Sequence, residues 1–242
     1  MATGKSELKE LLAELAKVHR KTKIAASPAH LLPSSPDDLL NLPLPQGFAR
    51  LKPPGHVGAI YEGMAEKFSV ASAFVATSIR QGGRALIVGH EAIVAGVAEE
   101  LKAAGVDPAA VRDAGQLLVV PREDLVAVAH EAPARLAQEC EQAATDGYAT
   151  LWVVLEPGFL PGAAGSTAAL REFGAKVDQE LFPHRPVIIL SLFSYQSLSP
   201  ALLRQILQTC HFLAYGGRVF TNLCRYPLEE FLPAVDPEFD SP

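Results

Sequence analysis

The sequence predicts an α/β fold of three layers, in which helices cover both faces of one mostly parallel β-sheet. Segments with strand patterns and segments with helix patterns alternate from residue 56 onward. The expected strands 84–90, 150–156 and 185–194 contain unbroken apolar runs, as parallel strands buried on both faces require. The 242 residues, 49% of them hydrophobic, are enough for a full-sized core.

Residues 1–22 are predicted to form an amphipathic N-terminal helix, because leucines recur at positions i, i+3, i+4 and i+7. This helix either packs on the main domain or docks on a partner or a second copy. Residues 23–54 are rich in proline and predict a linker or extended arm, with one helical turn at 36–40. The candidate partner-binding residues are Leu8, Leu11, Leu12 and Leu15.

Residues 55–233 are predicted to form the α/β body, and residues 234–242 a C-terminal tail. Glycines at 82 and 83 end the first helix of the body, and Ser199 with Pro200 begins the last one. Pro133 is expected to break or kink the long helix in the middle. The expected strands are 56–63, 84–90, 115–121, 150–156, 185–194 and a final pair at 212–217 and 218–222; the expected helices are 66–83, 91–107, 122–148, 166–182 and 199–210.

Composition excludes several classes of protein. A net charge of −6 argues against a general nucleic-acid binder and against a basic membrane-surface helix. No apolar run reaches the ~20 residues of a membrane span, and the first residues lack the apolar centre of a signal peptide. We therefore expect a cytoplasmic protein. Its cysteines, Cys140, Cys210 and Cys224, are far apart and form no CxxC pair, so we expect reduced, buried thiols.

The ends of the strands are the places to look for a ligand site, because ligands of open α/β sheets bind beyond the carboxyl ends of the strands. Tyr61 and Glu62 follow the first strand of the body, and His90 follows the second. Glu156 ends the strand 150–156, and Tyr195 and Gln196 follow the strand 185–194. For Glu156 a structural role and a ligand-facing role both stay open, since a buried acid is costly unless it is used. His211, beside Cys210, completes the candidate ligand-binding residues.

Motifs of catalysis do not occur in the sequence. The loop at 61–69 has one glycine, Gly63, and two acids where a phosphate-binding loop would read GxxxxGK[ST]. No GxSxG, no GxGxxG and no histidine pair at metal-ligand spacing is present. The sequence therefore predicts neither an enzyme nor a cofactor or metal site.

The order of several short motifs resembles the MEDS domain, the sensory domain named after methanogens, methylotrophs and the dichloromethane-responsive regulator. The motifs are "HVGAIYEG", "GQLLVV", "GYATLWVVLE" and "SYQSLSP", and the resemblance covers residues 55–233. It implies a fold similar to the RecA/KaiC-like ATPases but without the phosphate loop. It also implies a non-catalytic sensor of a small molecule, apolar or hydrocarbon-derived, that signals to an output domain.

Several positions depart from the family pattern. Gln196 stands where the family has an aspartate, Gly174 and Asp178 where it has a glutamate and an asparagine, and Phe212 where a proline follows the histidine; Glu156 is retained. These changes fit either a different ligand or a domain used for protein contacts. Residues 1–54 do not suit a helix-turn-helix, so we expect the output to be a protein partner in trans. The alternative is a ligand-free interaction or scaffold protein that self-assembles on a degenerate ATPase fold.

Overall fold

A computed structural model describes residues 40–121, 124, 132–156, 167–222 and 224. Within these residues eight strands form one sheet, in the order β1-β8-β7-β2-β6-β5-β3-β4. The strands from β7 to β4 are parallel to one another, whereas β8 pairs antiparallel with β7 and with β1. The strands are β1 (Asn41–Pro43), β2 (Gly55–Tyr61), β3 (Arg84–Gly89), β4 (Leu117–Pro121), β5 (Leu151–Leu155), β6 (Val187–Ser194), β7 (Phe212–Tyr215) and β8 (Arg218–Thr221).

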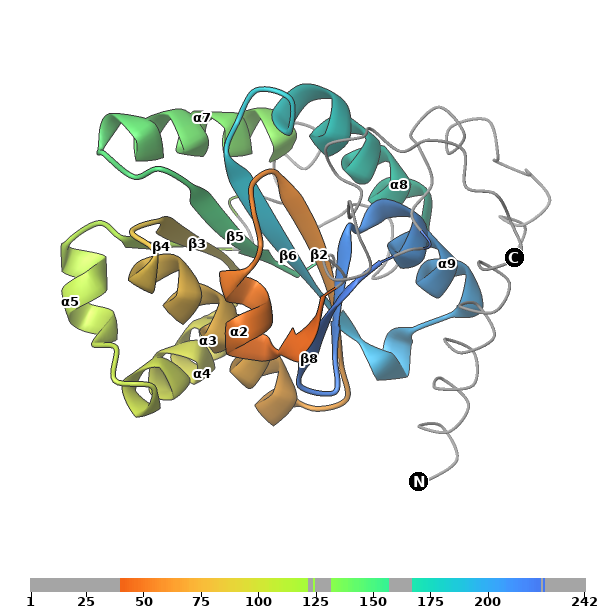
Figure 1. Cartoon of the computed structure of the whole chain (residues 1–242), viewed down its shortest axis with the longest axis horizontal. Coiled ribbons are helices and arrows are strands. Elements are labelled where there is room, and N and C mark those ends of the chain that lie inside the picture. Colours follow the sequence, from red (N-terminus) through yellow and green to blue (C-terminus); the bar gives the residue numbers. More distant parts are fainter. Residues whose placement is uncertain (1–39, 122–123, 125–131, 157–166, 223, 225–242) are drawn as a thin grey trace.

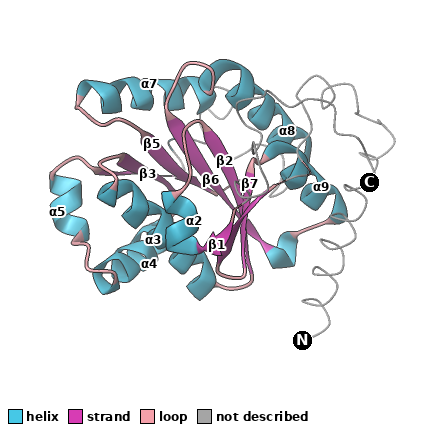
Figure 2. Ribbon diagram, in the orientation of Figure 1, coloured by secondary structure: helices cyan, strands magenta, loops and turns pink. Residues whose placement is uncertain are grey.

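Helices lie on both sides of this sheet, with α3 and α4 on one side and α7 and α8 on the other (Figures 1 and 2). The described residues contain seven α-helices: α2 (Leu44–Ala49), α3 (Met64–Arg80), α4 (Glu91–Ala103), α5 (Pro108–Asp113), α7 (Ala132–Thr145), α8 (Thr167–Lys176) and α9 (Pro200–Thr209). A π-helical turn, η4 (Val177–Leu181), extends α8, and a 3-10 turn, η5 (Tyr195–Ser197), follows β6. The predicted α/β class with a mostly parallel sheet is confirmed.

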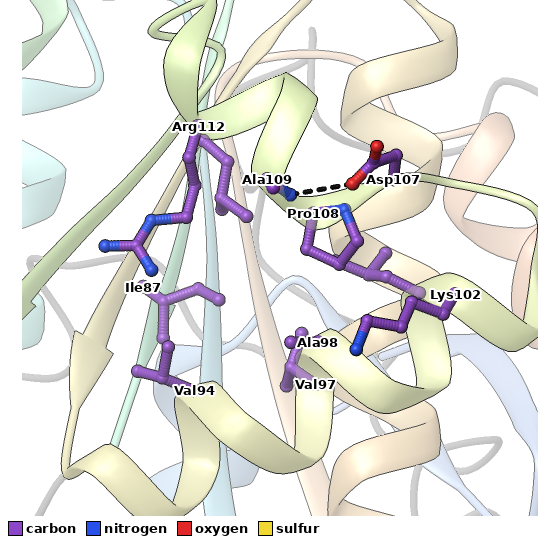
Figure 3. A pocket seen from close by; sticks show the side chains of 11 residues that line it. Ile87, Val94, Val97, Ala98, Lys102, Asp107, Pro108, Ala109 and Arg112 are labelled. Atoms are coloured by element: carbon purple, nitrogen blue, oxygen red, sulfur yellow. Dashed lines mark hydrogen bonds between the residues drawn. The ribbon is translucent and has the colours of Figure 1, made fainter.

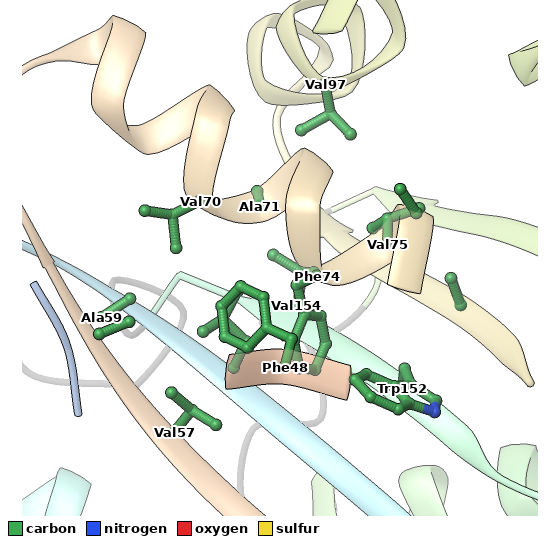
Figure 4. Packing of buried hydrophobic residues seen from close by; sticks show 14 of the residues in the cluster. Phe48, Val57, Ala59, Val70, Ala71, Phe74, Val75, Val97, Trp152 and Val154 are labelled. Atoms are coloured by element: carbon green, nitrogen blue, oxygen red, sulfur yellow. The ribbon is translucent and has the colours of Figure 1, made fainter. Parts of the chain in front are cut away.

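The core consists of two apolar layers, one on each face of the sheet, because side chains along a strand alternate between its faces. In β5, Leu151, Val153 and Leu155 join the layer under α7, α8 and α9. Trp152 and Val154 join the layer under α2, α3 and α4. In that second layer the rings of Phe48, Phe74 and Trp152 pack in series, with centroid distances of 5.3 and 4.8 Å (Figure 4).

Residues 41–49, which the sequence predicts as part of the linker, belong to the folded body. They form the edge strand β1 and the short helix α2. Phe48 of α2 has no exposed surface and is part of the core. The proline content of the segment concealed this, because Pro43 is tolerated in an edge strand and Pro45 in the first turn of a helix. The rest of the predicted arm, and the predicted N-terminal helix with its four leucines, lie outside the described residues.

Two further predictions about local structure are confirmed. The final strand pair is a hairpin, β7 and β8, whose turn residues Gly216 and Gly217 have φ of 56° and 77°. Positive φ at both central residues suits the turn that joins two twisted strands, and glycine adopts it without strain. The helix α9 begins at the predicted cap, where the Ser199 side chain accepts from the backbone N–H of Leu202.

The three cysteines are free thiols. Cys140 and Cys210 are buried, as predicted, whereas Cys224 is partly exposed, so the prediction of burial is wrong for Cys224. Burial raises the pKa of the Cys140 thiol to about 12. Such a thiol stays protonated at neutral pH, so Cys140 acts as a small apolar side chain. Among the described helices, none is both long and apolar enough to cross a membrane.

Candidate functional site

Four adjacent parallel strands bring most of the candidate residues to one edge of the sheet. β2, β6, β5 and β3 are neighbours in that order, and all four end at the same edge. Tyr61 is the last residue of β2, His90 follows β3, Glu156 follows β5, and Tyr195 follows β6. This carboxyl edge is the expected place for a ligand in an open α/β sheet.

An ion pair between Lys67 and Glu156 lies at the centre of this edge. Lys67 is in the first turn of α3, directly beyond the end of β2, and its Nζ donates to Oε1 of Glu156. The side chains are only 8% and 18% exposed. Each of these two charges stabilises the other, since burying an unpaired charge lowers the stability of a protein by several kcal/mol. The pair therefore explains why Glu156 can follow a fully buried strand.

Tyr61 completes a compact group with this ion pair, and we call Tyr61, Lys67 and Glu156 the edge cluster. Nζ of Lys67 lies 5.5 Å from the centroid of the Tyr61 ring, within the range of a cation–π contact. Burial raises the pKa of the Tyr61 hydroxyl, and the negative charge of Glu156 raises it further. The ring is therefore a neutral phenol that partly covers the charged pair.

A second polar group lies beside the edge cluster, at the ends of β2 and β7. The Tyr215 hydroxyl donates to Oε1 of Glu62 at 3.4 Å. The backbone N–H of Glu62 donates to Oε2 of Glu66 at 2.8 Å, which fixes the start of α3. Burial raises the pKa of Tyr215, and the nearby groups, chiefly Glu62, raise it further. Tyr195 packs with Tyr215 on the small apolar cluster of Ile60, Leu203 and Leu207, whereas Gln196 is exposed in η5.

His90 lies at the other end of the edge, where it lines an open hollow. His90 is the N-cap residue of α4 and is exposed. The hollow has a volume of about 850 Å³ and extends from the end of β3 to the end of β4 along α4. Glu156 does not line the hollow but lies close to Gly89, which does, because a Cβ added at Gly89 would be 3.8 Å from Oε2 of Glu156. The hollow is lined by Gly89, His90, Glu91, Ala92, Val94, Ala95, Ala98, Arg112, Val119 and Pro121.

His211 does not belong to the carboxyl edge. Helix α9 returns the chain to the amino edge of the sheet, so that His211 precedes β7 and lies beside the start of β2. The Nδ1 atom of His211 accepts from the backbone N–H of His56 at 3.1 Å. The backbone N–H of His211 donates to the backbone carbonyl of His56 at 2.8 Å. These contacts fasten β7 to β2, which is a structural role.

Sequence reasoning missed three parts of this region: Lys67 as the partner of Glu156, Tyr215, and the hollow. The pairing of Lys67 with Glu156 could have been predicted, because the first turn of the helix after β2 and the end of β5 both lie at the carboxyl edge of a parallel sheet. No group of three His, Cys, Asp or Glu side chains that could hold a metal ion occurs in the described part of the chain.

A family model described as "MEDS: MEthanogen/methylotroph, DcmR Sensory domain" matches residues 55–211. The chain belongs to the MEDS family. The match begins with β2 and ends at His211, so that the edge cluster and the hollow lie inside the MEDS region. Membership supports a sensory or signalling role. The comparison with curated proteins finds no match.

Proposed function

We propose that this MEDS chain is a non-catalytic sensory protein that binds a small ligand at the carboxyl edge of its sheet and acts through a protein partner. The observation that carries the proposal is the hollow of about 850 Å³ beside Gly89 and His90. Its size is within the range of ligand pockets, and its position is the one that open α/β folds use for ligands. Because the chain belongs to a sensory family, binding of that ligand would serve as a signal.

The edge cluster supports the non-catalytic part of the proposal. In an ATPase of the RecA/KaiC kind, a lysine at the start of the helix after the first strand neutralises phosphate, and an acid at a strand end holds the metal ion. Here Lys67 and Glu156 neutralise each other. Glu62 and Glu66, at the start of the same helix, would repel a triphosphate. We therefore propose a degenerate ATPase fold without nucleotide chemistry.

The ion pair also gives a means of signalling. A ligand in the hollow that reaches the ion pair changes the balance between Lys67 and Glu156, and Lys67 is part of α3, a 17-residue helix. A change at the pair is therefore passed to the start of α3 and to the end of β5. Coupling of this kind needs the ligand to favour one arrangement of the pair over the other.

The first test is native mass spectrometry of the protein purified gently from its own host, with Ala95→Trp as the test variant. Ala95 is exposed, and of the two hollows along α4 it lines only the large one, so a tryptophan there fills the space. The matched control is Ala144→Trp, at an exposed position of α7 on the other face of the sheet. We expect a small-molecule adduct in the wild type and the control but not in Ala95→Trp. An adduct that survives Ala95→Trp would contradict the proposed site.

The scaffold alternative is favoured by one observation, namely that Lys67 and Glu156 satisfy each other's charge. A ligand-free oligomer, or a co-purified protein without an adduct, would support it. For partner binding the informative truncation is residues 1–39, because a longer one removes β1 and α2 from the core. Loss of the partner on this truncation would assign the contact to the N-terminal segment. A thermal shift with ATP would contradict the non-catalytic proposal, since ligand at ~100 times its Kd adds ~2.7 kcal/mol.

A further inference from the structure

A narrower cavity adjoins the large hollow and makes one continuous groove with it. This cavity has a volume of about 250 Å³ and lies between α4, α5 and the strands β3 and β4 (Figure 3). Val94, Ala98 and Arg112 line both spaces, so that they mark the place where the two join. The groove thus runs from the end of β3, beside the edge cluster, to the start of α5.

Most of the residues that line the narrow cavity are apolar, and the charged ones are Lys102, Asp107 and Arg112. Ile87, Val97, Leu101 and Leu117 are at most 4% exposed and form its base. The small side chain of Ala98 on α4 leaves the space above them open. Ala92 and Ala95, on earlier turns of the same face of α4, do the same in the large hollow. An apolar cavity of this kind is a favourable place for a hydrocarbon chain, which leaves water when it binds.

Arg112 places a positive charge at the junction of the two spaces. Its guanidinium group lies on the Ile87 and Val94 side of the cavity, and the ammonium group of Lys102 lies on the other side (Figure 3). Lys102 donates to Glu99 at 2.8 Å. Asp107 caps α5, where its side chain accepts from the backbone N–H of Ala109.

Among the described residues, no hydrogen bond or ion pair engages the Arg112 side chain. Of the two acids that line the groove, Asp107 lies in the narrow cavity, where it caps α5, and Glu91 lines only the large hollow. Arg112 is therefore the cation of the groove that still lacks an anion.

We propose that this groove binds an amphiphilic anion, a single apolar chain that ends in a carboxylate, with the chain in the narrow cavity and the carboxylate on Arg112. Because Arg112 lines both spaces, the carboxylate lies in the large hollow described under the proposed function; this names the class of ligand for that hollow, and it rests on that proposal. Arginine binds a carboxylate through two parallel N–H···O bonds. A chain of up to on the order of ten carbons fits, since an apolar cavity of about 150 Å³ holds the six carbons of benzene.

The test uses octanoate as the probe and octan-1-ol as its neutral equivalent, with Kd measured by isothermal titration calorimetry. Methyl shifts of Val94, Val97 and Leu101 in NMR spectra give the place of binding. We expect octanoate to bind more tightly than octan-1-ol and to shift these methyl groups. A groove that were only apolar would prefer the alcohol, because its hydroxyl costs less to remove from water than a carboxylate does.

Two variants with matched controls separate the charge from the space. Arg112→Gln is expected to raise the Kd of octanoate about fivefold, the effect of losing an ion pair at a solvent-facing position, and to leave the Kd of octan-1-ol unchanged. The control is Arg204→Gln, at an exposed position of α9. Ala98→Phe is expected to abolish binding of both probes because it fills the cavity, whereas Ala144→Phe on α7 has no effect.

Equal binding of the two probes, or an unchanged octanoate Kd in Arg112→Gln, would overturn the proposed class of ligand. If native mass spectrometry still finds an adduct that Ala95→Trp removes, the proposed function survives that result. If neither an adduct nor binding of either probe is found, both proposals fail. Co-sedimentation with phosphatidylglycerol vesicles that Arg112→Gln abolishes would assign the anion to a lipid surface and would overturn the free single-chain ligand.

Discussion

Removal of Lys67 is the most direct test of the edge cluster. In Lys67→Met the side chain keeps its length and loses its charge, which leaves Glu156 with 18% exposure and without its partner. Breaking a buried ion pair in this way costs about 3–5 kcal/mol. Because Glu156 keeps some contact with water, we expect a loss at or just below the lower limit of that range, about 2–3 kcal/mol. This is a large fraction of the ~5–15 kcal/mol by which a domain is stable.

Urea unfolding measures this loss, and the fluorescence of Trp152 reports it. Trp152 is the single tryptophan of the chain and is 2% exposed, so that unfolding changes its surroundings strongly. A loss of 2–3 kcal/mol lowers the midpoint by about 1 M urea for m-values of ~2–3 kcal/mol/M. The double variant Lys67→Met with Glu156→Gln should regain most of the loss, because no unpaired charge remains.

The control for this series is Lys102→Met, which breaks the pair between Lys102 and Glu99. Both of these side chains are more than half exposed, at 60% and 74%. A surface pair contributes about 0–1 kcal/mol, so Lys102→Met should change the free energy of unfolding little. If Lys67→Met costs no more than Lys102→Met, or if the effects of Lys67→Met and Glu156→Gln simply add, the two charges are not coupled and the account of the edge cluster is refuted.

Three further predictions concern the rest of the fold. Gly174→Ala places a Cβ 2.4 Å from Cγ2 of Thr209, so we expect the free energy of unfolding, measured by thermal unfolding, to fall by about 1–3 kcal/mol. Thr209→Ser should relieve this loss, because serine lacks that methyl group. Burial raises the pKa of Cys140 from 9.0 to about 12. The contribution of this protonated thiol to the free energy of unfolding is therefore present below pH 9 and is lost as the pH rises toward 12. Cys140→Ala should flatten this decline, and an unchanged dependence of stability on pH would contradict the prediction. The Arg84 side chain is 6% exposed, donates to the Gly115 carbonyl at 2.8 Å and to Asp146 at 2.5 Å, and lies over a tyrosine ring. Arg84→Gln should therefore cost about 2–3 kcal/mol, and more than Asp146→Asn; a smaller loss than in Asp146→Asn would refute this order.

The sheet was predictable from the sequence because its central strands are buried on both faces. The segments 84–90, 150–156 and 185–194 are apolar throughout, and each contains a strand of the structure. The helix α5 was not predicted, since six residues are too few for a periodic pattern, although Asp107 and Pro108 are its N-cap and first residue. β1 was not predicted either, because a three-residue edge strand depends on its pairing with β8.

The site was predictable only in part. The carboxyl ends of parallel strands share one edge of the sheet, and this rule placed Tyr61, Glu156 and Tyr195 correctly at that edge. It did not extend to His211, because the residue after a helix that returns to the sheet lies at the opposite edge. The groove depends on how α5 packs beside the alanines of α4, and neither periodicity nor residue spacing contains that information.

The place of β2 in the sheet has a consequence for how the chain folds. β2 lies between β6 and β7, so that Val57 pairs with Leu190 on one side and with Phe212 on the other. Both partners are more than a hundred residues away along the chain, and contacts of such length slow folding because large loops must close first. During synthesis β2 must wait until β6 and β7, its two neighbours in the sheet, have left the ribosome. Until then both edges of β2 are unpaired and can pair with another chain, so that a chaperone bound to β2 would protect the chain from aggregation during synthesis.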